Sequence, residues 1–133
     1  MKIAIIIVRS LFGLLFVFSA VVVLFKVPMD APAPTGNALT FMTGLMATGY
    51  FMTLLKVTEL ICGILLVVNF CAPLATVVIF PISVNILLFH AFLDDPKNLP
   101  TALFVVLANL FLAYAYRKNY AGLLATKPLY TNT

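Results

Sequence analysis

Four long apolar stretches occupy most of this chain and constrain its fold more than any other feature. They cover residues 3–25, 51–70, 73–93 and 100–116. A helix needs about 20 mainly apolar residues to cross a bilayer, and the connections between these stretches are mostly short. The sequence therefore predicts an all-α integral membrane protein, folded as an antiparallel four-helix bundle.

The composition excludes a water-soluble domain. Hydrophobic residues make up 64% of the chain and charged residues only 9%, with a mean hydropathy of +1.17. A soluble domain carries about a quarter charged residues. The net charge of +4 is small and scattered, which argues against nucleic-acid binding. We expect one membrane domain over residues 1–120, surrounded by membrane lipids, and a tail at 121–133 whose lack of pattern is compatible with disorder.

A short extra helix is expected between the first two spans. Pro28, Pro32, Pro34 and Gly36 interrupt the helical pattern. The charge-free segment 38–49 that follows is too short to cross a membrane and too apolar to lie in water. It is either an interfacial or re-entrant helix packed over the mouth of the bundle, or an early, tilted turn of the next span.

The distribution of basic residues orients the bundle. One side carries Lys2, Arg117, Lys118 and Lys127, while the charges on the other side nearly cancel; these are Lys26, Asp30, Asp94, Asp95 and Lys97. Cytoplasmic loops of membrane proteins are enriched in Lys and Arg. Both termini are therefore expected in the cytoplasm.

The only glutamate of the chain lies inside the second span. At about 100° per residue, Lys56, Glu59 and Gly63 share one helical face. Charged groups in a membrane usually face the bundle interior and find partners. We predict that Glu59 is buried, pairs with Arg9 or Lys56, and accepts a hydrogen bond from Asn85.

Several polar residues of different spans are expected at similar depths. The predicted topology places Lys56, Glu59, Asn85 and His90 in the outer half, and Arg9 is deeper but long enough to reach toward Glu59. The sequence thus predicts a ligand-binding pocket in the outer half, roofed by segment 38–49. In the alternative, these groups have only structural roles: Lys56 neutralises Glu59, Asn85 and Asn109 clamp helices, His90 lies among head groups and Arg9 extends to the nearer membrane surface.

The sequence offers no catalytic motif. It contains no Ser/His/Asp set, P-loop or dinucleotide fingerprint. With a single histidine, His90, no metal site is predicted. Cys62 and Cys71 would lie about 13 Å apart along one helix, too far for a disulfide, and are interpreted as packing residues.

The order and spacing of several short motifs resemble the DoxX family of small four-span bacterial membrane proteins. The resemblance extends to about Tyr120, and its motifs are Arg9 with Leu11-Phe12-Gly13, Ala47-Thr48-Gly49-Tyr50, Glu59 with Gly63, Pro81 through His90, and Tyr116-Arg117. It implies a four-helix membrane fold and a multi-pass location in the bacterial inner membrane.

The functional implication of the resemblance is broader. The family takes its name from a subunit of a thiosulfate:quinone oxidoreductase, and other members are linked to membrane redox complexes and stress responses. This implies an accessory subunit that binds a small or lipid-like molecule, with quinone as a candidate cofactor and a membrane protein or a second copy as partner. The alternative is a noncatalytic assembly or chaperone-like subunit without a ligand. Without a redox-active cysteine pair or a haem-ligand pair, the question of enzymatic activity is left open.

Overall fold

The computed structural model describes residues 2–28, 34–93 and 96–123, and within them every regular element is a helix. The elements are α1 (Lys2–Leu24), α2 (Gly36–Ala47), α3 (Phe51–Val68), α4 (Ala72–Phe92) and α5 (Leu99–Ala115), with the short 3-10 helices η1 (Pro96–Asn98) and η2 (Arg117–Tyr120). The helices α1, α3, α4 and the continuous segment Pro96–Ala115 are long and apolar enough to cross a membrane. The predicted fold class is confirmed.

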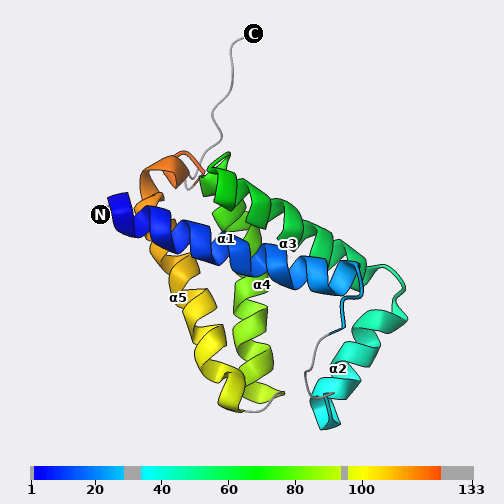
Figure 1. Ribbon diagram of the computed structural model, residues 1–133. Coiled ribbons are helices and arrows are strands. Elements are labelled where there is room, and N and C mark those ends of the chain that lie inside the picture. The colour runs from blue at the N-terminus through cyan, green and yellow to red at the C-terminus, as the bar shows by residue number, and fades with distance from the viewer. Residues whose placement is uncertain (1, 29–33, 94–95, 124–133) are drawn as a thin grey trace.

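The four spans form two antiparallel pairs (Figure 1). Helix α1 packs along α3, and α4 packs along α5; further contacts join α3 to α4 and α1 to α5. The two pairs cross steeply and separate toward the side on which α2 lies, while the N-terminus and η2 lie on the opposite side. The bundle is therefore wider at one membrane face than at the other.

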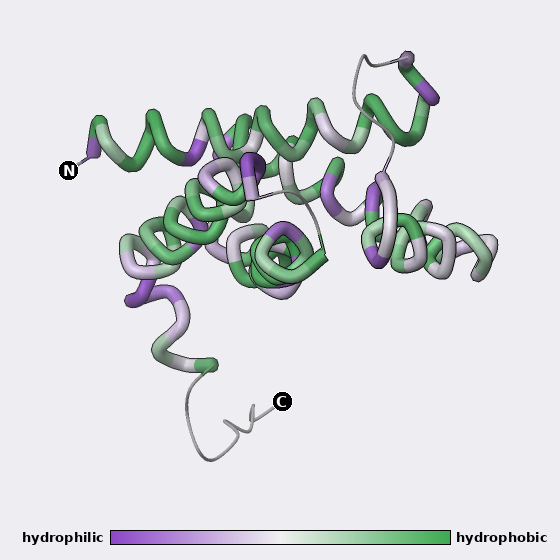
Figure 2. Tube along the Cα trace, turned by 90° about the horizontal axis from the view of Figure 1, so that it is seen from below, coloured by the Kyte–Doolittle hydropathy of each residue, from purple (hydrophilic) through white to green (hydrophobic). Residues whose placement is uncertain are grey.

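The core runs along the crossing of the two pairs. It consists of Phe12, Phe16, Cys62, Leu66, Ala72, Ala75, Ile79, Val105, Ala108 and Leu112. Large apolar side chains such as Phe18, Leu54 and Leu107 are exposed on the outside of the spans, and hydrophobic colour follows most of each span (Figure 2). Hydrocarbon rather than water is the solvent that suits this surface.

Two glycines bring the backbones of α1 and α3 into direct contact. A Cβ atom built on Gly63 would lie 2.8 Å from the carbonyl oxygen of Gly13, and one built on Gly13 would lie 2.8 Å from the carbonyl oxygen of Gly63. Small residues allow membrane helices to approach this closely. The reciprocal contact explains why α1 and α3 pack more extensively than the other pairs.

Helix α2 is a separate element. It ends before a turn that contains Gly49 at φ +79°, and the hydroxyl of Thr48 accepts a hydrogen bond of 2.9 Å from the Phe51 amide at the start of α3. The alternative of an early turn of the second span is therefore wrong. Helix α2 packs against α3, and its Phe41 ring lies 5.4 Å from that of Phe89 in α4.

The predicted tail lies mostly outside the described residues, which end at 123. Within them the chain continues past α5 as η2. The hydroxyl of Tyr120 donates a 2.7 Å hydrogen bond to the carbonyl oxygen of Pro73 and so joins η2 to the start of α4.

Candidate functional site

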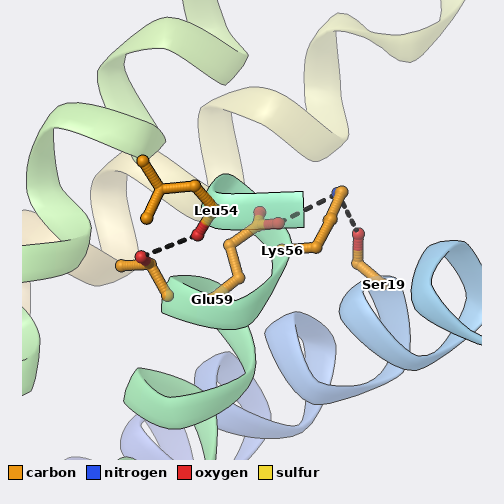
Figure 3. A network of polar contacts seen from close by, with 5 residues as sticks. Ser19, Leu54, Lys56 and Glu59 are labelled. Atoms are coloured by element: carbon orange, nitrogen blue, oxygen red, sulfur yellow. Dashed lines mark hydrogen bonds and ion pairs between the residues drawn. The ribbon is translucent and has the colours of Figure 1, made fainter. Parts of the chain in front are cut away.

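Glu59 lies in the interior of the bundle with 2% of its surface exposed. It shares the buried face of α3 with Cys62, Gly63 and Leu66. Lys56, one turn earlier, places its Nζ 2.9 Å from Glu59 Oε2. The same ammonium donates a 3.1 Å hydrogen bond to the hydroxyl of Ser19 in α1 (Figure 3). The pair thus neutralises a buried carboxylate and joins α3 to α1.

The contact between Lys56 and Glu59 is an ion pair within one helix, and its separation of 2.9 Å is close enough for strong attraction. Coulomb attraction depends on separation and on the surrounding dielectric, and it is strengthened away from water. The Lys56 side chain keeps 13% of its surface exposed, so the cation lies at the edge of the interior and the anion within it.

Arg9 does not pair with Glu59. The Lys56–Glu59 pair is the one ion pair among the described residues, and Arg9 Nε is buried without a hydrogen-bond partner there. The reason is depth. Ser19, which contacts Lys56, lies ten residues beyond Arg9 on α1, or about 15 Å at the rise of an α-helix. Of the two predicted partners, the structure selects Lys56.

The predicted hydrogen bond from Asn85 to Glu59 is wrong. Asn85 is exposed, whereas Thr76, Ile79 and Ser83 form part of the buried face of α4. Two residues along a helix correspond to about 200° of rotation, so the inward position of Ser83 turns Asn85 away from the interior. Ser83 was not among the predicted site residues. The available signal was the helical period: because they are two residues apart, Ser83 and Asn85 cannot both face the interior.

His90 is half-buried in the last turn of α4. Its ring packs edge-on against that of Phe89 at 5.3 Å. Ser83, the inward residue of this half of α4, is seven residues earlier, or about 10 Å along the helix. Of the predicted site residues, the described contacts join Lys56 to Glu59, while Asn85 is exposed on α4.

A hollow of about 220 Å³ lies instead where α1, α2 and α3 meet. Its lining residues are Val23, Leu24, Lys26, Leu45, Met46, Gly49, Tyr50, Met52 and Thr53. Most are apolar, and Lys26, Tyr50 and Thr53 supply polar groups. Thr53 lies three residues before Lys56, so the hollow is next to the ion pair along α3. Helix α2 contributes one wall, in the place where the sequence predicted a roof.

A second polar contact joins α4 to α5. The side-chain amide of Asn109, fully buried, donates a 3.4 Å hydrogen bond to the carbonyl oxygen of Thr76. The Thr76 hydroxyl in turn donates to the carbonyl oxygen of Ala72 at 2.8 Å. Asn109 therefore clamps α4 to α5, the structural role that the sequence offered for it as an alternative.

The family comparison covers the first three of these spans and the short helix after the first. The family model for DoxX matches residues 4–91, well over half of the chain. The chain belongs to the DoxX family. The matched part of this DoxX protein begins in α1 and ends in the last turn of α4, so it includes the ion pair, and α5 lies beyond it. No curated protein and no solved structure matches the chain.

Proposed function

We propose that this DoxX protein is an accessory subunit of a membrane redox system and holds a lipid-like molecule of the quinone class. The observation that carries the proposal is the hollow between α1, α2 and α3, adjacent to the buried Lys56–Glu59 pair. The link to a redox system rests on the family resemblance, which includes a quinone-reducing enzyme.

The lining of this hollow suits a quinone head group. Such a ring needs an apolar slot and a few hydrogen-bond donors for its carbonyl oxygens. Leu45, Met46 and Met52 provide apolar surface, while Tyr50 and Thr53 provide hydroxyl groups. A volume of about 220 Å³ fits a head group rather than a whole lipid. The isoprenoid tail would then lie in the membrane along the exposed apolar faces of the spans.

Lipid analysis of the purified protein tests the proposal. After extraction in mild detergent, mass spectrometry should find a quinone bound to the wild type. Thr53→Val removes one hydroxyl from the hollow with little change of shape, so bound quinone should fall about two- to tenfold, the value of one hydrogen bond. Thr43→Val is the matched control, because Thr43 is exposed on α2 and does not line the hollow.

Two outcomes would refute this proposal. One is the absence of a quinone or other specific lipid from repeated preparations. The other is an equal quinone content in the Thr53→Val and Thr43→Val proteins.

A noncatalytic assembly subunit is the second candidate, and the position of Asn85 favours it. Its carboxamide is exposed on a span, and such groups join membrane helices by hydrogen bonds. Gly13 and Gly63 cannot serve as a partner surface, since they pack against each other. A photo-crosslinker at Asn85 in native membranes distinguishes the two candidates: a stable partner, together with an unchanged phenotype of Glu59→Gln, supports assembly.

We place the protein in the bacterial inner membrane with both termini in the cytoplasm. The start of α1 and η2 lie at the same end of the bundle (Figure 1), and Lys2, Arg117 and Lys118 give that end positive charge. Alkaline phosphatase should be active when fused at Pro34 and inactive when fused at Thr133. The reverse pattern would put the hollow beside α2 on the cytoplasmic face.

A further inference from the structure

A second hollow, of about 310 Å³, lies at the opposite end of the bundle from α2. It is lined by Cys71, Pro73, Leu74, Val77, Asn119, Tyr120 and Leu123. One wall is the first two turns of α4, and the other is η2 with the turn that follows it. The hydrogen bond from Tyr120 to the Pro73 carbonyl holds these walls together. Burial raises the pKa of the Tyr120 hydroxyl, so this donor keeps its proton at neutral pH.

The walls of this second hollow are mainly hydrocarbon. Leu74 is 59% exposed, Val77 is 44% exposed and Leu123 is 76% exposed. Leu74 and Val77 belong to a span and face lipid, but Leu123 lies eight residues beyond the end of α5. An exposed leucine past the end of the last span extends the apolar surface into the head-group region. An acyl chain would cover this surface better than water does.

Two basic residues adjoin the hollow along the chain. Arg117 and Lys118 immediately precede the lining residues Asn119 and Tyr120 in η2. Arg117 donates a 2.9 Å hydrogen bond to the Tyr114 carbonyl and lies 4.3 Å from the centre of the Tyr114 ring, which fixes its charge at the end of α5. Lys118 is exposed. Glu59 is the one acidic residue among the described residues, and it lies in the middle of α3, nine residues before the end of that helix.

We infer that this hollow binds an anionic phospholipid. One acyl chain lies along Leu74, Val77 and Leu123, and the phosphate of the head group faces Lys118 and Arg117. Basic residues close to the membrane surface attract anionic lipids in this way. This inference does not depend on the proposed function, because the hollow between α1, α2 and α3 lies at the other end of the spans.

Native mass spectrometry in an uncharged detergent tests this inference on the full chain. Three lipids with identical acyl chains are offered separately: phosphatidylglycerol, phosphatidylcholine and diacylglycerol. The wild type should retain phosphatidylglycerol most strongly. The double substitution Arg117→Gln/Lys118→Gln should reduce its retention to the level of phosphatidylcholine, since each lost charge near a membrane surface weakens binding about fivefold. Leu74→Trp should lower the retention of all three lipids.

Matched controls separate this site from general attraction. Lys97→Gln removes a charge at the other end of α5, and Leu107→Trp adds the same bulk on an exposed face of α5 outside the hollow; both should retain phosphatidylglycerol as the wild type does. Equal retention of the three lipids by the wild type, or full retention by the Arg117→Gln/Lys118→Gln protein, would overturn the inference.

Discussion

Replacing Lys56 with methionine should lower the free energy of unfolding by about 3–5 kcal/mol, the usual cost of leaving one charge of a buried pair without its partner. Glu59 is almost completely buried, and Lys56 is its one ion-pair partner among the described residues. The substitution keeps the length of the side chain, so lost packing contributes little. It also removes the hydrogen bond to Ser19 that joins α3 to α1. Equilibrium unfolding in mixed detergent micelles measures the change.

A double-mutant cycle separates the ion pair from its surroundings. Lys56→Met/Glu59→Gln should cost less than the sum of the single substitutions, because no charge is then stranded; contacting pairs show coupling of about 0.5–3 kcal/mol. Arg9→Ala and Glu59→Gln should add independently, given the distance between these residues. Asn85→Leu should change stability by less than about 0.5 kcal/mol, as exposed positions usually do. Additivity of Lys56 with Glu59, or coupling of Arg9 with Glu59, would contradict this account.

Gly63→Val should disrupt the packing of α1 against α3. The first added carbon would meet the Gly13 carbonyl oxygen and Val17 Cγ2, both at 2.8 Å. A backbone oxygen cannot rotate out of the way, so the two helices must move apart. Gly63→Ala should cost about 1–3 kcal/mol, the range for one extra carbon in a tightly packed site, and the larger Gly63→Val should leave little folded protein. Thermal unfolding of the purified variants measures the effect.

Gly44 provides the matched control for Gly63. It lies inside α2, and a Cβ atom built there would have no neighbour within 4 Å. Alanine in place of a helical glycine gains about 0.5–1 kcal/mol when space allows. Gly44→Ala should therefore keep or raise stability. Similar effects of Gly44→Ala and Gly63→Ala would mean that the close approach of α1 and α3 is not needed for folding.

The length of the apolar stretches was enough to predict the spans and their order, and it left a separate helix after the first span as one of two alternatives. Lys56 was one of the two partners predicted for Glu59, since residues three apart meet on one helical face. These features depend on local spacing along the chain. They did not require knowledge of how the helices are rotated against each other.

The sequence was insufficient to predict how each helix is rotated about its own axis, and so which side of it faces the interior. Helix α4 carries large apolar residues on all sides, such as Val78, Ile79 and Phe80, so periodicity does not reveal which side faces inward. Asn85 was assigned by depth alone, and its side of the helix was missed. The hollow lined by Tyr50 and Thr53 depends on the turn at Gly49, which brings α2 back beside the start of α3. The local spacing of residues does not predict contacts that form when the chain turns back in this way.

The steep crossing of the two helix pairs has a consequence for the surrounding bilayer. Helix α3 has 18 residues and is therefore about 27 Å long, already shorter than a hydrocarbon core of about 30 Å. In a steep crossing the two pairs cannot both stand upright in the membrane, and tilt reduces the thickness that a helix spans. Lipid next to the protein must become thinner or flanking side chains must extend to the head groups, each at a small cost per ångström. Thick, tightly ordered membranes would consequently be a less favourable environment for this bundle than thin ones.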